Sequence, residues 1–194
     1  MLGDVCEVQM GFTARARLTK KRNGWRVVQL SDLSPNGRIR AADVQPVDVN
    51  EPGSAHQLRD GDVVFRSRGA SNIANDVVLG VDDVLAVAAP LMILRPEPTK
   101  ILGRYLAWAI NSASAQAYFE RNAQGTGVRM ISKATLTQLT IPVPPLQTQA
   151  RIVEIDDLSM REEALQVAIA TARRNLVGHL LGQVATGQIE GARQ

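Results

Sequence analysis

The sequence has few of the residues that form covalent cross-links and metal sites. Its 194 residues include one cysteine and two histidines. One cysteine excludes an internal disulfide and favours a reducing compartment, so we expect the chain in the cytoplasm. His56 and His179 have no cysteine or carboxylate at ligand spacing, and we expect no metal site. Cys6 lies in a predicted strand and is expected to be buried rather than nucleophilic.

Long apolar segments and a secretory signal are missing as well. A helix that crosses a bilayer needs about 20 mostly apolar residues. The apolar stretch 84–94 is shorter and contains a proline, so a pair of buried strands suits it better. The N-terminus carries no basic segment followed by an apolar run. These absences predict a protein that neither crosses a membrane nor is secreted.

Signatures of catalysis are also absent. The sequence contains no P-loop, and the glycines at 125 and 127 lack dinucleotide-binding spacing. The sequence PVPPL at 142–146 lacks the Asn or Asp and the aromatic residue that hold a flipped adenine in amino-methyltransferases. Adjacent acidic pairs such as Asp82–Asp83 point in divergent directions on a helix or a strand, so they make poor acid–base dyads. We therefore expect no catalytic residue and no bound cofactor.

One segment is rich in basic residues and contains no acidic residue. The net charge of +3 and the isoelectric point of about 9.4 favour an anionic partner. We interpret the segment 13–26 as a loop that lies along DNA, with cations on phosphates and one or two arginines at guanine edges. A solvated loop with scattered charges is the alternative. The basic residues between Glu7 and Asp32 are Arg15, Arg17, Lys20, Lys21, Arg22 and Arg26.

Two further segments carry candidate DNA contacts. In the sequence FRSRG, Arg66 and Arg68 alternate on a predicted strand and would share one face. In the sequence QGTGVRM, Thr126 could donate to a phosphate and Arg129 could contact the DNA backbone. The alternatives are a pair of ordinary surface arginines and a turn that only reverses the chain.

The hydrophobic pattern changes along the chain. Short β-branched and apolar runs, bounded by Gly, Pro, Asn and Asp, predict strands and loops over 1–100. Apolar residues then recur every three or four positions from 100 to 122, which predicts one amphipathic helix. A short strand is expected at 128–131, followed by a small helix capped by Ser132.

A strand expected at 139–143 precedes two prolines and a long helical segment. Pro144 and Pro145 end the strand, and Pro145 suits the first turn of a helix. The helix predicted from 145 to 186 would be about 60 Å long at 1.5 Å per residue, too long for the preceding body to cover. Its apolar positions have nearly the spacing of a coiled-coil seam, with the charged residues mainly off it, and they require a partner helix. These positions are Ile155, Leu158, Leu165, Ile169, Ala172, Leu176 and Leu180.

The segment IPVPPLQTQARI at 141–152 resembles the end of a target recognition domain in the specificity subunits of type I restriction–modification systems. In that family a strand, a double proline, a leucine, a glutamine and an isoleucine-rich helix follow one another. Thr148 stands where glutamate is usual. Weaker likenesses at 2–12, 25–33 and 58–69 extend the resemblance over nearly the whole chain. The matching residues in the first segment are Ile141, Pro142, Pro144, Pro145, Leu146, Gln149 and Ile152.

The resemblance implies an α+β fold. A β-rich mixed target recognition domain at 1–143 would be followed at 144–194 by one long helix that forms an antiparallel coiled coil with a partner. The chain would be a non-catalytic subunit that binds double-stranded DNA, an adenine methyltransferase subunit carrying S-adenosylmethionine, and later a restriction subunit. Full-length members carry two recognition domains and two helices, so two copies of this chain are expected to pair and read a split palindromic site. A different specificity-type chain is the alternative partner.

Three other functions stay open at this stage. A protein-interaction adaptor or regulator would keep the long helix without reading DNA. The recognition subunit of another phage-defence methyltransferase would share the fold. An enzyme ranks third, because no catalytic motif supports it.

Overall fold

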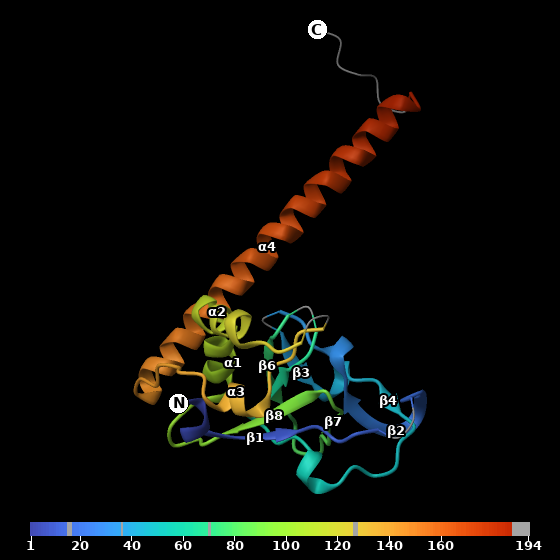
Figure 1. Cartoon of the computed structure of the whole chain (residues 1–194). Coiled ribbons are helices and arrows are strands. Elements are labelled where there is room, and N and C mark those ends of the chain that lie inside the picture. The colour runs from blue at the N-terminus through green and yellow to red at the C-terminus, as the bar shows by residue number, and fades with distance from the viewer. Residues whose placement is uncertain (15–16, 36, 70, 126–127, 188–194) are drawn as a thin grey trace. The chain divides into compact units, whose positions relative to one another are not determined.

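The chain forms two compact units, Met1–Val153 and Glu154–Gln194. The computed structural model describes residues 1–14, 17–35, 37–69, 71–125 and 128–187 (Figure 1). The first unit holds both β-sheets and the shorter helices, and the second holds the greater part of one long helix. The domain boundary predicted at 143 falls inside the first unit.

Both sheets of the first unit are mixed. The larger sheet has the strand order β1-β8-β5-β6-β3, and its β3–β6 pair is parallel while the other pairs are antiparallel. The smaller sheet has the order β4-β2-β7, with β2 antiparallel to β4 and parallel to β7. The expected β-rich mixed fold is confirmed. The strands are β1 (Cys6–Met10), β2 (Lys20–Val28), β3 (Arg38–Arg40), β4 (Pro46–Val47), β5 (Val63–Arg66), β6 (Ala74–Val78), β7 (Ala86–Val87) and β8 (Leu91–Pro96).

Helices α1, α2 and α3 lie at one end of the first unit, and strands β2 and β4 lie at the other (Figure 1). No described helix is long and apolar enough to cross a membrane. The α-helices are α1 (Gly103–Asn111), α2 (Ala113–Asn122), α3 (Lys133–Thr137) and α4 (Leu146–Ala185), and the 3-10 helices are η1 (Leu2–Asp4), η2 (Leu30–Asp32), η3 (Ala41–Asp43) and η4 (Ser54–His56).

The larger sheet is buried on both faces. On β5, Phe65 belongs to a core cluster that includes Tyr105 and Ile110 of α1, whereas Val64 belongs to a second cluster. This second cluster includes Val28, on β2 of the smaller sheet. Successive side chains of a strand point to opposite faces, so one strand supplies both cores. Cys6 is buried as predicted, and burial raises the pKa of its thiol to about 12.

The predicted helix from 100 to 122 is two helices. Helix α1 ends at Asn111 and α2 begins at Ala113, because the Ser112 hydroxyl accepts a hydrogen bond from the Ala115 backbone N–H and caps a new helix. The small helix capped by Ser132 is confirmed as α3, where Ser132 Oγ accepts from the Thr135 N–H over 3.0 Å.

Two predicted strands are not formed. The segment 139–143 joins neither sheet, although Leu139 and Ile141 are buried as they would be on one face of a strand. Pro142 has no N–H to donate to a neighbouring strand, which weakens any pairing here. At 128–131, the described residues make only isolated bridges at Met130.

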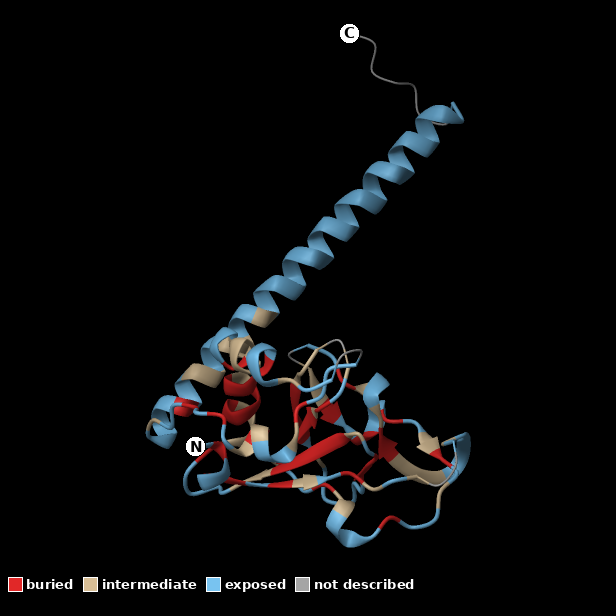
Figure 2. Cartoon of the chain, in the orientation of Figure 1, coloured by how far each residue is buried: buried red, intermediate tan, exposed pale blue. Residues whose placement is uncertain are grey.

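Helix α4 begins one residue after the predicted start and ends one residue before the predicted end. The carbonyl of Pro145 accepts the first helical hydrogen bonds, from the N–H groups of Thr148 and Gln149. Ile152 and Val153 pack against the core of the first unit. From residue 161 to 187 every residue is exposed (Figure 2). A mixed β-rich body with one long C-terminal helix is therefore confirmed.

Candidate nucleic-acid interface

Strand β2 carries cations on its first half and core residues on its second half. Lys20, Lys21 and Arg22 are exposed, whereas Val27 and Val28 have no exposed surface. From Lys20 onward the predicted basic loop is therefore a strand. The valines anchor the strand in the core, and the cations are left to solvent.

The cations on β2 lie at an irregular step in the sheet. Lys20 and Trp25 are both in register with Val47, so residues 21–24 have no partner positions on β4. A Cβ atom at Gly24 would lie 2.1 Å from the carbonyl oxygen of Val47. Because glycine has no Cβ atom, β2 can approach β4 closely at Gly24. The bulge before Gly24 leaves Lys21 and Arg22 exposed to solvent.

One of these cations has a partner within the chain. Lys21 Nζ lies 2.7 Å from a carboxylate oxygen of Asp48, and the two side chains are 55% and 59% exposed. Ion pairs this exposed contribute about 0–1 kcal/mol, so Lys21 can exchange Asp48 for a phosphate at little cost. Arg17, in the segment before β2, is also exposed.

Arg26 points inward. Its guanidinium donates hydrogen bonds to the backbone carbonyls of Ala41 and Val44, over 2.9 and 2.6 Å. These two bonds tie β2 to the chain around η3. Arg26 was predicted as a DNA contact, and its Nη1 atom is instead engaged by the fold.

Arg66 and Arg68 do not share a strand face. Strand β5 ends at Arg66, whose guanidinium donates to the carbonyls of Leu30 and Leu33 over 2.6 and 3.2 Å. The next residue, Ser67, is buried and its hydroxyl donates to the Pro90 carbonyl. Arg68 is exposed. Strand β5 therefore stops before Arg68, and the two arginines are not on one continuous strand.

The structure instead brings Arg68 next to Arg129. The backbone of Arg68 forms an antiparallel bridge with Met130, and the Gly69 N–H donates to the Arg129 carbonyl over 3.3 Å. The N–H of Ile131 donates to the Ser67 carbonyl over 2.8 Å. Both arginines are exposed. Two segments far apart in sequence thus lie side by side, and each carries an exposed arginine. The predicted contacts Arg15 and Thr126 lie outside the described residues.

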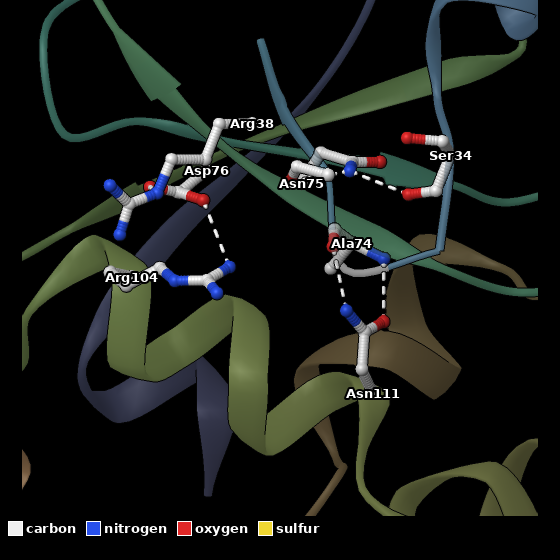
Figure 3. Close-up of polar contacts among 8 residues, drawn as sticks. Ser34, Arg38, Ala74, Asn75, Asp76, Arg104 and Asn111 are labelled. Atoms are coloured by element: carbon white, nitrogen blue, oxygen red, sulfur yellow. Dashed lines mark hydrogen bonds and ion pairs between the residues drawn. The ribbon is translucent and has the colours of Figure 1, made fainter. Parts of the chain in front are cut away.

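An ion cluster around the buried Asp76 side chain lies at the β3 edge of the larger sheet. The Asp76 carboxylate on β6 lies 3.3 Å from Arg38 of β3 and 3.2 Å from Arg104 of α1 (Figure 3). Burial raises the pKa of Asp76, and the two arginines oppose that rise. The cluster joins β3, β6 and α1. No sequence motif pointed to it, because its members come from three separate elements.

Two asparagines near the cluster, Asn75 and Asn111, fix adjacent backbone (Figure 3). Asn75 Nδ2 donates to the carbonyls of Ser34 and Gly37, and the side chain of Asn111 exchanges two hydrogen bonds with the backbone of Ala74 (Figure 3). These bonds secure the chain before β3 and the connection between α1 and β6. They serve the scaffold that positions the exposed cations.

A hollow of about 730 Å³ lies beside the basic segment. Its lining includes Phe12, His56 and the carboxylates of Asp48 and Glu51. Two carboxylates disfavour a phosphate inside the hollow, so the exposed bulge on β2 suits an anion better. In the part of the chain that the structure describes, no group of three His, Cys, Asp or Glu could hold a metal ion.

The predicted apolar positions of α4 are exposed. Ile155 is 67% exposed and Leu165 is 64% exposed, values far above those of core residues. Exposed apolar side chains repeated along one helix are typical of surfaces that bind protein partners. The exposed members are Ile155, Leu158, Leu165, Ile169, Ala172, Leu176 and Leu180.

A comparison with known protein families shows which family this chain belongs to. Residues 1–159 match the type I restriction modification DNA specificity domain, and the chain therefore belongs to that family. This confirms the resemblance seen in the sequence. No curated protein matches the chain.

Solved structures show the same fold. One, from work on complex assembly and conformational transition of the type I R-M system, is 24% identical with a TM-score of 0.64 over 90% of this chain. The HsdS subunit of Thermoanaerobacter tengcongensis is 24% identical with a TM-score of 0.59 over 86% of the chain. The S subunit from M. genitalium is 14% identical with a TM-score of 0.55 over 94% of the chain. The matches span 41%, 38% and 44% of those longer chains.

Proposed function

We propose that this chain is the DNA sequence-recognition subunit of a type I restriction–modification complex and performs no catalysis itself. Membership of the specificity-domain family carries this proposal. The cations displayed on the β2 bulge and the exposed stripe of α4 give the chain one surface for DNA and one for protein.

The first unit would contact double-stranded DNA. Exposed Arg17, Lys20, Lys21 and Arg22 would meet phosphates, and arginines at the groove edge would read guanines. Arg68 and Arg129, which lie on two segments joined by backbone bonds, would form a second contact region. Arg26 and Arg66 would act indirectly, because their hydrogen bonds to carbonyls hold the segments that carry the exposed cations.

Helix α4 would bind protein partners. We infer that it pairs antiparallel with the α4 helix of a second copy, so that two recognition units read the halves of a split palindromic site. An adenine methyltransferase subunit would dock on the paired helices, and a restriction subunit would join that complex in the cytoplasm. S-adenosylmethionine would be bound by the methyltransferase, which flips the target adenine.

Co-expression with the methyltransferase subunit tests this function. The two proteins should copurify, and sequencing of the host genome should reveal methylated adenines in one split palindromic motif. A variant with Arg17→Glu, Lys20→Glu and Arg22→Glu should copurify equally well but leave that motif unmethylated. Copurification without any DNA binding by the unmodified chain would identify an adaptor instead. Methyl transfer by the isolated chain would identify an enzyme.

A further inference from the structure

The apolar stripe of α4 is interrupted by one acidic residue, Glu162. Glu162 lies four residues after Leu158 and three before Leu165, which is the spacing of a coiled-coil seam. Glu162 is therefore an exception to the expectation that charges avoid the seam. It is exposed and accepts a hydrogen bond from Gln166 over 3.1 Å. A carboxylate buried in a helix–helix seam needs a cationic partner.

Arg173 is placed to be that partner, but only on another helix. It follows Ile169 by four residues and precedes Leu176 by three, so it lies at the edge of the same stripe. Within one helix, Glu162 and Arg173 are separated by roughly 16 Å along the axis, too far for an ion pair. A second helix that runs in the opposite direction can bring the two charges together.

The apolar stripe is nearly symmetric about the midpoint between these charges. Halfway between Glu162 and Arg173 lies the peptide bond between residues 167 and 168. Ile155 and Leu180 are equally far from this midpoint along the sequence. Leu158 and Leu176 are equally far from a point half a residue away, at residue 167, and so are Leu165 and Ile169. An antiparallel pair centred there would place large apolar residues opposite one another along the seam. Charge positions and apolar positions therefore indicate registers that agree to within one residue.

The distribution of charge along α4 supports a second copy as the partner. From 154 to 163 the helix has five acidic residues and one basic residue, and from 164 to 187 it has two arginines and no acidic residue. Opposite orientation places the acidic half of each helix against the basic half of the other. Parallel orientation in register would place Glu162 beside Glu162 and Arg173 beside Arg173, which is repulsive.

We propose that α4 is an interface with a second copy of this chain, antiparallel and centred between Val167 and Ala168, in which Glu162 of each copy pairs with Arg173 of the other. This proposal rests on the helix pairing in the proposed function and adds its register. The carboxylate in the seam sets that register, as single polar seam residues do in coiled coils.

Charge reversal tests the paired residues. Glu162→Lys and Arg173→Glu should each weaken the dimer about tenfold, because each creates two like-charge contacts per dimer. The combined variant should restore the affinity. Glu163→Lys and Arg174→Glu are matched controls: they make the same charge changes one residue further on, outside the stripe, and should have little effect. The dimer dissociation constant is measured by sedimentation equilibrium.

The outcomes separate the register from the dimer itself. A monomeric unmodified chain overturns both the register and the pairing in the proposed function. A stable dimer in which the seam variants behave like their controls overturns the register alone. Loss in the single variants without recovery in the combined variant also overturns the assigned pair.

Cross-linking tests the direction of the helices independently. Ile155→Cys combined with Leu180→Cys should form a covalent dimer on mild oxidation, whereas either substitution alone should not. Cys6 should not interfere, because it is buried with a strongly raised pKa. A covalent dimer formed by Ile155→Cys alone would show parallel helices and overturn the proposal.

Discussion

The side-chain oxygen of Gln149 accepts a hydrogen bond from the backbone N–H of Leu102 over 2.9 Å. The side-chain nitrogen donates to the carbonyls of Lys100 and Pro144, over 2.9 and 2.7 Å. Gln149 has no exposed surface. One amide group thus ties the start of α4 to the double proline before it and to the chain that leads into α1.

Gln149→Leu should lower the free energy of unfolding of the first unit by about 2–4 kcal/mol, because three backbone groups would lose the hydrogen bonds that this buried side chain makes. Urea unfolding followed by circular dichroism measures the loss. Gln147→Leu makes the same chemical change at an exposed position on the same turn and should change stability by less than about 0.5 kcal/mol. Equal losses in the two variants would contradict the role assigned to Gln149.

Gly24→Ala should lower stability by about 1–3 kcal/mol, because its Cβ atom would collide with the Val47 carbonyl. DNA affinity should fall as well, since β2 must shift to relieve the collision and the cations of the bulge would move with it. Gly53→Ala is the control: no atom lies within 4 Å of its added Cβ, and its φ of −53° suits alanine. An unchanged unfolding midpoint for Gly24→Ala would argue against the bulge.

Arg68→Ala and Arg129→Ala should each weaken DNA binding and lower the slope of log affinity against log salt by about one, as expected when one phosphate contact is lost. Fluorescence anisotropy at several salt concentrations measures that slope. Arg59→Ala removes an exposed arginine outside both basic regions and should leave the slope unchanged. The contact assignment fails if Arg59→Ala reduces the slope as much as the other two.

Cys6 should make stability fall at high pH. Its pKa is raised by burial from 9.0 to about 12, so the folded state favours the neutral thiol. The resulting stabilisation is fully present below pH 9.0 and is lost as pH rises toward about 12. Cys6→Ala should lack this part of the pH dependence in urea unfolding. At pH 9, iodoacetamide should alkylate the unfolded chain quickly and the native chain slowly, and equal rates would refute the burial of the thiol.

Local patterns in the sequence were sufficient to predict α4 and its exposed stripe. Pro144 and Pro145 mark where the helix can begin, and its length is set by a run without proline. The break between α1 and α2 was missed because Ser112 lies inside a continuous apolar periodicity, and its capping role appears only when its hydroxyl meets the Ala115 N–H.

Long-range contacts could not be predicted in the same way. Arg26 and Arg66 have the same chemistry as the exposed arginines, and only the folded chain brings carbonyls within their reach. The pairing of the Arg68 and Arg129 segments depends on backbone bonds across some sixty residues. The spacing of residues predicts which side chains are neighbours along one helix or strand. It does not predict contacts between segments that are far apart in the sequence.

The division of β2 into two halves has a consequence for the choice of target. Val27 and Val28 hold the strand in the core, whereas the side chains of Lys20, Lys21, Arg22 and Asn23 are exposed and add little to the core. If the proposed function holds, substitutions at Lys20, Lys21 and Arg22 would alter which target is chosen and leave the core intact.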